Sequence, residues 1–218
     1  MNFIEFNKNR KIKQGVNSAF FFLLLTLGWL YFSSFGFIIL ACMSGGVAIA
    51  FLLSGRKWCD WYCPRGSFFD FVLEYVSPKK KIPAIFKNFA VRIIIIAAML
   101  VIVFWQVYER YPEGYRSIGK FFLIPLTITT IAGILLGIFI HPRGWCYICP
   151  VGTFGNLISR IKSKLIISKE KCVICRACSK VCPMQIEPFK YLNTGEILDG
   201  DCLRCGKCKA VCSKNAIK

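Results

Sequence analysis

The sequence predicts a mostly α-helical membrane protein in two parts, with four transmembrane helices in residues 1–164 and a small α+β domain in residues 165–218. Three observations predict this fold class. Four apolar runs are long enough to cross a bilayer, a motif containing tryptophan and two cysteines occurs twice, and eight regularly spaced cysteines lie near the end of the chain. The repeated motif predicts that the membrane domain is a duplicated helical hairpin.

The apolar runs cover residues 16–32, 35–53, 89–107 and 121–140. At about 1.5 Å of rise per residue, runs of this length just cross a hydrocarbon core of about 30 Å. Overall, 56% of the residues are hydrophobic and 20 are phenylalanine, which is too apolar for an ordinary soluble domain of 218 residues. The composition therefore favours an integral membrane protein.

The distribution of lysine and arginine predicts the orientation of the chain. The 54–88 connection holds seven basic residues, whereas the 108–120 loop holds three together with two glutamates. The positive-inside rule then places both termini in the cytoplasm, and residues 1–15 are interpreted as a basic topology signal. The net charge of +18 fits an anionic membrane surface, and no nucleic-acid-binding motif is present.

The eight C-terminal cysteines form two copies of the spacing C-x2-C-x2-C-x3-C, by which bacterial ferredoxins hold [4Fe–4S] clusters. Three thiolates two residues apart bind three corners of one cluster, and the fourth binds the other cluster. The predicted ligands are Cys172, Cys175, Cys178 and Cys212 for cluster I, and Cys202, Cys205, Cys208 and Cys182 for cluster II.

Zinc and disulfides explain this spacing less well. The stretch contains no histidine, and its two halves do not show the pairs of C-x2-C separated by a longer loop that zinc sites use. Cluster ligands must stay reduced, which again favours the cytosol. Residues 165–218 carry ten Lys and Arg against five Asp and Glu. This surface suits an acidic ferredoxin or flavodoxin as a soluble partner, with attraction to anionic lipid as the alternative.

The repeated membrane motif reads RKWCDWYCPRGSFF at 56–69 and RGWCYICPVGTFG at 143–155. Each copy follows a predicted hairpin, so the four cysteines should meet at one depth on the cytoplasmic face. Four thiolates suit a third iron–sulfur cluster, with a reactive dithiol couple and zinc as alternatives. Each motif begins with an arginine that is either an inside charge or a cation that offsets cluster charge. The cysteines are Cys59, Cys63, Cys146 and Cys149, and the arginines are Arg56 and Arg143.

In its layout and in both cysteine motifs, the whole chain resembles the NapH/NosR-type membrane iron–sulfur proteins. The resemblance implies multi-pass insertion in a prokaryotic cytoplasmic membrane, quinol oxidation, and electron delivery to other redox subunits. The second membrane motif departs from the usual C-x3-C-P spacing, because its two cysteines are separated by one residue fewer.

The sequence predicts electron handling and no other chemistry. It has no P-loop, GxGxxG or Ser/His/Asp arrangement, and its one histidine, His141, cannot supply the two axial ligands of a bis-histidine haem. The leading hypothesis is a membrane-bound electron-transfer subunit working between a quinone or a soluble ferredoxin-type donor and a membrane redox partner. The alternative is an assembly factor that reduces a metal or thiol for another enzyme.

Overall fold

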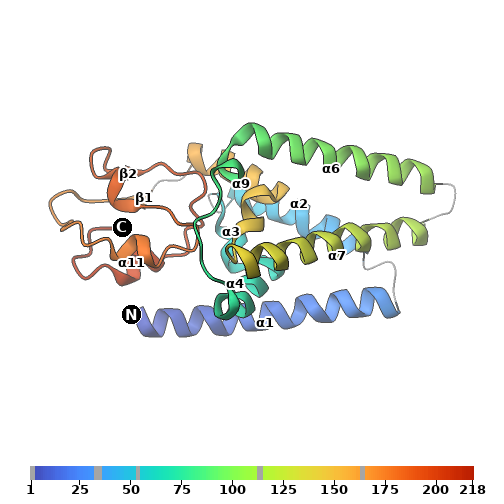
Figure 1. Cartoon of the computed structure of the whole chain (residues 1–218), viewed down its shortest axis with the longest axis horizontal. Coiled ribbons are helices and arrows are strands. Elements are labelled where there is room, and N and C mark those ends of the chain that lie inside the picture. Colours follow the sequence, from blue (N-terminus) through green and yellow to red (C-terminus); the bar gives the residue numbers. More distant parts are fainter. Residues whose placement is uncertain (1–2, 32–35, 53–54, 112–114, 163–164) are drawn as a thin grey trace.

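The computed structural model describes residues 1–218 except 1–2, 32–35, 53–54, 112–114 and 163–164. Four long helices run side by side, and the cysteine-rich C-terminal domain lies at the end of the molecule where both termini also lie, with the start of the first long helix running alongside it (Figure 1). The long helices are α1 (Phe3–Leu30), α2 (Gly36–Leu52), α6 (Phe89–Arg110) and α7 (Tyr115–Phe139).

Helices α6 and α7 carry the segments that are long and apolar enough to cross a membrane. Only 11% and 33% of the residues in their apolar windows are buried, so neither is the core helix of a soluble protein. The exposed side chains of α6 include Ile94, Val101 and Phe104, each at least 65% exposed, and those of α7 include Ile128 and Phe139, at 61% and 64%. Apolar surface of this extent is expected to contact lipid. The other two predicted spans lie on α1 and α2, and the four-span count remains a prediction.

Helix α1 begins much earlier than the first predicted apolar run. Residues 1–15 were interpreted as a topology signal, but described residues from Phe3 onward are helical and continue into the apolar run. One face of this helical extension is buried, because Arg10, Gln14 and Ser18 are each at most 4% exposed. The interpretation as a plain basic signal is therefore wrong, since these side chains pack against the motif helices described below.

Each cysteine motif folds as a one-turn helix followed by a helix of 13 residues. The first motif forms α3 (Lys57–Trp61) and α4 (Pro64–Val76), and the second forms α8 (Gly144–Ile148) and α9 (Pro150–Lys162). Proline at the first helical position starts both longer helices, where its missing N–H costs nothing. Helix α2 packs on α9 and helix α7 packs on α4. Each of these two helices therefore contacts the motif that does not directly follow it in the sequence.

The C-terminal domain is small and irregular. Strands β1 (Leu165–Ile166) and β2 (Glu196–Ile197) pair antiparallel, with Leu165 opposite Ile197, and Ile167 bridges Ile217 near the end of the chain. The short helices are α10 (Ala177–Lys180), η3 (Pro188–Tyr191) and α11 (Lys207–Val211), while α5 (Ala84–Lys87) precedes α6 in the membrane part.

Candidate iron–sulfur sites

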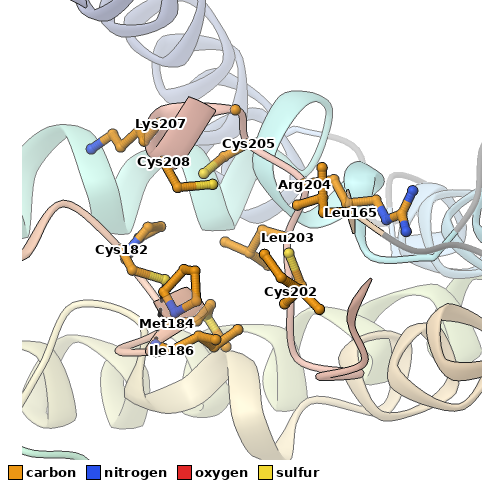
Figure 2. A pocket seen from close by; sticks show the side chains of 14 residues that line it. Leu165, Cys182, Met184, Ile186, Cys202, Leu203, Arg204, Cys205, Lys207 and Cys208 are labelled. Atoms are coloured by element: carbon orange, nitrogen blue, oxygen red, sulfur yellow. Dashed lines mark hydrogen bonds between the residues drawn. The ribbon is translucent and has the colours of Figure 1, made fainter. Parts of the chain in front are cut away.

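One cavity in the C-terminal domain is lined by Cys182 together with three cysteines of the second half. Figure 2 shows these cysteines arranged around the cavity. Apolar side chains such as Leu203 and Met184, each at most 2% exposed, form its walls. The cysteines of this cavity are Cys182, Cys202, Cys205 and Cys208.

A second cavity lies in the other half of this domain. Cys212 joins the three cysteines of the first half here, so each half contributes one cysteine to the other half's cavity. The loop that lines this cavity is the more exposed of the two, because Val173 is 63% exposed whereas Leu203, at the same position of the other loop, is 2% exposed. The cysteines of this cavity are Cys172, Cys175, Cys178 and Cys212.

The two cysteine loops share one backbone conformation. Ile174 and Arg204 hold the same position in their C-x2-C spacing, and both have φ of 53°. A β-branched residue such as isoleucine rarely adopts this left-handed region, so the conformation must be imposed by the surrounding loop. The fourth cysteines also match, because backbone N–H groups four residues on donate to their sulfurs, from Ile186 to Cys182 over 3.4 Å and from Ala216 to Cys212 over 3.3 Å.

These last two hydrogen bonds show that proline after the fourth cysteine is not needed for the local fold. The first half has Pro183 at that position and the second has Ser213, yet both sulfurs accept from the same relative N–H. Hydrogen bonds to the sulfurs are one of the features that tune a bound cluster.

The membrane motifs present their second cysteines at helix N-termini. Cys63 caps α4, and its sulfur accepts from the N–H of Gly66 over 3.4 Å, while Cys149 directly precedes α9. The positive end of a helix dipole stabilises a thiolate or an anionic group there. Cys59 and Cys146, the first cysteines, are both 8% exposed and lie in the one-turn helices α3 and α8.

The unequal spacings of the two motifs are accommodated by one turn. The N–H of Cys149 donates to the carbonyl of Trp145, four residues back, over 3.1 Å. The N–H of Cys63 donates to the carbonyl of Trp58, five residues back, over 2.9 Å. The additional residue of C-x3-C therefore widens this turn and leaves the start of the next helix equivalent in both motifs.

The arginine of each motif contacts the other motif. Arg143 donates to the backbone carbonyl of Cys59 over 2.8 Å, and Arg56 donates to the backbone carbonyl of Cys146. Both arginines are 0% exposed, so they are not simple inside charges. Arg143 also donates to the sulfur of Cys146 over 3.7 Å, and Arg65 donates to the sulfur of Cys149 over the same distance. Cationic side chains thus surround the four cysteines.

The glycine of each Cys-Pro-x-Gly sequence makes these crossed contacts sterically possible. A Cβ on Gly66 would lie 2.7 Å from the carbonyl oxygen of Cys59 and 3.0 Å from a guanidinium nitrogen of Arg143. A Cβ on Gly152 would lie 2.5 Å from the carbonyl oxygen of Cys146 and 2.8 Å from Arg56. Side chains at these two positions would separate the motifs.

Among the described residues, no three His, Cys, Asp or Glu side chains lie close enough together to hold a single metal ion. The same holds for the eight C-terminal cysteines, which are expected to bind clusters. A [4Fe–4S] cluster binds each ligand to a different iron, so its ligands lie farther apart than the ligands of a single ion.

A buried ionic network joins α1 to both motifs. Arg10 pairs with Asp60 and Asp70, and Arg143 donates to both oxygens of Asp70 over 2.7 Å. Burial opposes ionisation of Asp70, but the charges and hydrogen bonds of the arginines outweigh it and hold its pKa well below the usual value. This network was not expected, because Arg10 lies within the segment interpreted as a topology signal.

A second ionic network joins the membrane motifs to the C-terminal domain. Asp201, which directly precedes Cys202, accepts from Arg56 over 2.6 Å and from Arg92 over 2.7 and 2.9 Å. The amide of Asn156 in α9 also donates to Asp201, over 2.7 Å. Burial disfavours the charged carboxylate, yet Arg56 and Arg92 together keep the pKa of Asp201 below its usual value.

The two parts of the chain also share one hydrophobic core. Cys59 and Tyr147 from the motifs pack in the same buried cluster as Met184, Leu203 and Cys205 from the C-terminal domain. The hydroxyl of Tyr147 donates to the carbonyl of Met184 over 2.6 Å. The C-terminal domain is therefore docked on the membrane motifs through packed side chains and buried polar contacts.

Family models match both groups of cysteines. One, described as a 4Fe-4S binding domain, matches residues 35–83 and 123–168, which contain the two membrane motifs. Another, described as a 4Fe-4S dicluster domain, matches residues 164–213. Curated relatives include the ferredoxin-type protein NapH of Escherichia coli, which is 24% identical over 77% of this chain and 63% of its own length. The chain belongs to the NapH-type family of iron–sulfur proteins.

Two further relatives match most of the chain. The NapH-type chain is 32% identical to the uncharacterized protein MJ0749 of Methanocaldococcus jannaschii, over 95% of this chain and 85% of that protein. It is 28% identical to the methylamine utilization ferredoxin-type protein MauN of Methylorubrum extorquens, over 74% of this chain and 61% of that protein. No solved structure matches the chain.

The predictions of recognition and cofactor are thus confirmed, since the chain is a NapH-type protein that binds [4Fe–4S] clusters. Its relatives include ferredoxin-type proteins, and its apolar helices indicate a membrane protein. Sequence reasoning missed Asp201, Asp70, Arg10 and Arg92. The signal available for Asp201 was its place beside Cys202, and for Arg92 its place as a charge at the start of an apolar run.

Proposed function

We propose that this NapH-type chain is a membrane-bound electron-transfer subunit with three iron–sulfur sites arranged from its exposed end into its membrane domain. Bound clusters supply one-electron transfer. The chain holds them, keeps water away and balances their charge. The observation that carries the proposal is that Cys205 of the C-terminal domain and Cys59 of the first membrane motif lie in one buried core. The C-terminal domain and the membrane motifs are therefore connected by closely packed protein.

The eight C-terminal cysteines fit two clusters. The two cavities group them into four and four, with Cys182 and Cys212 exchanged between the halves, and hydrogen bonds reach the sulfurs of both. We assign cluster I to the cavity of Cys172, Cys175, Cys178 and Cys212, and cluster II to the cavity of Cys182, Cys202, Cys205 and Cys208.

The four membrane-motif cysteines fit a third cluster. Two of their sulfurs accept hydrogen bonds from Arg143 and Arg65, and both motifs fall within matches to a 4Fe-4S binding domain. The crossed contacts of Arg56 and Arg143 hold the two motifs together, which a shared site requires. Cations near the sulfurs would offset the negative charge of a thiolate-ligated cluster.

The proposed placement has four spans, with residues 1–164 as a membrane domain built from two related hairpins and residues 165–218 on the cytoplasmic surface. Support comes from the excess of basic residues in 54–88 and from the position of both termini at one end of the long helices. The ends of α6 and α7 nearest residues 112–114 lie at the opposite end (Figure 1).

The exposed end of the C-terminal domain suits a soluble partner. Val173 and Ile174 form a small apolar surface over the cluster I cavity, and the exposed basic residues Lys171, Arg176 and Lys214 line the same cavity. We propose an acidic ferredoxin or flavodoxin there, and a quinone or another redox subunit in the membrane as the second partner.

The order of the sites can be tested with Cys208→Ser, which should remove a cluster II ligand. The full-length protein, reconstituted in vesicles, is mixed with a reduced ferredoxin, and reduction of each cluster is followed by freeze-quench EPR. We expect cluster I to become reduced at the normal rate in the variant while the membrane-motif site stays oxidised. Equally fast reduction of the membrane site in both proteins would contradict the proposed order.

The membrane placement has its own test. A reporter fused after Lys218 should be active in the cytoplasm, and one inserted between residues 111 and 115 should be active on the outer side. Activity of both reporters on the same side would contradict the four-span arrangement.

A further inference from the structure

The two membrane motifs carry different polar residues at one equivalent position of their longer helices. The seventh residue after Cys63 is Asp70, and the seventh residue after Cys149 is Asn156. Asp70 accepts from the Nε of Arg143 over 2.7 Å, and Arg10 supplies a second guanidinium to the same carboxylate. The first motif helix thus provides its own carboxylate for two buried arginines.

The corresponding place in the second motif lacks a carboxylate. Within the described part of the chain, the Nε of Arg56 and the Oδ1 of Asn156 are buried without a hydrogen-bond partner. Two buried arginines nevertheless lie there, because Arg56 is 0% and Arg92 is 1% exposed. A buried guanidinium without an acid is strongly unfavourable, so a carboxylate from elsewhere is needed.

Asp201 provides that carboxylate. Its Oδ1 accepts from Arg56, Arg92 and Asn156 at 2.6, 2.9 and 2.7 Å, and its Oδ2 accepts from Arg92 at 2.7 Å. In the first motif two acids of that motif, Asp60 and Asp70, pair with Arg10 and Arg143. In the second motif an acid of the C-terminal domain pairs with two arginines, and an amide takes the place of the missing acid.

We propose that Asp201 is a positioning residue that docks the cluster domain on the membrane motifs by completing the charge balance of the second motif. Because Cys202 is the next residue, this contact also sets the position of the cluster II cavity relative to Cys59 and Cys146. The docking does not depend on the proposed function, whereas the effect on electron transfer rests on it.

Gly200 gives independent support for a close contact at this place. A Cβ on Gly200 would lie 2.7 Å from both the backbone oxygen and the side-chain oxygen of Asn156. The loop therefore approaches α9 without a side chain, and the N–H of Asp201 donates to Asp199 over 2.8 Å, which orients the loop. Gly200→Ala should push the loop from α9 without changing any charge.

A carboxylate-transfer cycle tests the docking. The full-length protein in detergent micelles is compared with Asp201→Asn, Asn156→Asp and the double variant, with Glu187→Gln as the control. Glu187 forms an exposed pair with Lys190 on the same domain, away from the docking contact. Thermal unfolding is measured together with hydrogen–deuterium exchange in residues 150–160 and 199–206.

The expected effects of Asn156→Asp have opposite signs in the two backgrounds. In the wild-type protein the new carboxylate faces Asp201, so exchange in 199–206 should rise. Asp201→Asn alone should raise exchange in both segments. Adding Asn156→Asp to this variant gives Arg56 and Arg92 an acid again, so exchange in 150–160 should return toward the wild-type rate. Gly200→Ala should raise exchange in 199–206, and Glu187→Gln should change neither segment.

If Asp201→Asn exchanged at the wild-type rate in both segments, the docking role would be overturned. The same conclusion would follow if Asn156→Asp failed to slow exchange in the Asp201→Asn background. The positioning role in electron transfer predicts that Asp201→Asn and Gly200→Ala slow reduction of the membrane-motif site at least tenfold while iron content stays unchanged. An unchanged rate would overturn that role alone. Absence of iron at the membrane site would instead overturn the proposed function and leave the docking result standing.

Discussion

Arg143 donates to the backbone carbonyl of Cys59 over 2.8 Å, although the two residues are 84 positions apart. The matching contact joins Arg56 to the carbonyl of Cys146, so the arginine of each motif contacts the first cysteine of the other. Two short cysteine motifs, each too small to form a site alone, become one unit through these crossed contacts. The buried aspartates behind them keep the arginines charged and in place.

The stability of this unit should depend on Arg143. Arg143→Met removes a fully buried cation and leaves Asp60 and Asp70 to share Arg10, so we expect the free energy of unfolding to fall by about 3–5 kcal/mol. Arg65→Met, which removes a partly buried cation that contacts Thr129 and the sulfur of Cys149, should cost less. Denaturant unfolding in detergent measures both values. Equal losses would show that the buried network is not a major source of stability.

The crossed grouping of cysteines predicts the effects of two single substitutions. Cys182→Ser should abolish cluster II and spare cluster I, although Cys182 belongs to the first half of the sequence repeat. Cys178→Ser, in the same half, should abolish cluster I. EPR spectra of the reduced proteins distinguish the two signals. Loss of the same signal in both variants would mean that each half binds its own cluster.

His141 should make the protein less stable in mild acid. Burial lowers the pKa of this histidine to about 4, with Asp70 opposing the shift and Arg143 and Lys79 adding to it. The unfolded chain takes up a proton below about pH 6.5, whereas the folded chain does so only near pH 4, so stability falls as the pH drops through this window.

The His141→Gln variant provides the control for that effect. Thermal unfolding of both proteins between pH 7.5 and pH 5 should give a smaller decrease for the variant, because glutamine takes up no proton. An identical pH dependence would assign the decrease to other groups.

Reduction by a soluble partner should depend on salt. The basic side chains near cluster I would steer an acidic ferredoxin toward the exposed Val173 and Ile174 surface, so the second-order rate should fall as ionic strength rises. Replacing Lys171, Arg176 and Lys214 together by glutamine should lower the rate and weaken its salt dependence. A rate that is independent of salt in the wild-type protein would exclude electrostatic steering.

The sequence was informative where the physics is local. Apolar runs of 19 and 20 residues predicted most of α6 and of α7. The cysteine spacings identified the cofactor because cluster ligation needs few residues at short separations. In each case the pattern and the structure involve neighbours along the chain.

Contacts between distant residues could not be predicted in this way. Arg56 and Asp201 are separated by 145 positions, and Arg10 and Asp70 by 60, so no local period relates them. A basic residue before an apolar run has the same local pattern whether it faces water or a buried carboxylate. Arg10 was therefore assigned to a topology signal, and the pairing became visible only once α1 was placed against α4.

The central claim is that the two membrane motifs together hold a third cluster, and iron content tests it most directly. Anaerobically purified full-length protein should contain about 12 iron atoms per chain with a third [4Fe–4S] cluster, about 10 with a [2Fe–2S] cluster, and about 8 with the C-terminal pair alone. We predict about 12 in the wild-type protein, and about 8 in Cys63→Ala and in Cys149→Ala with the EPR signals of clusters I and II retained. About 8 in all three proteins, with identical low-temperature EPR spectra, would contradict the claim.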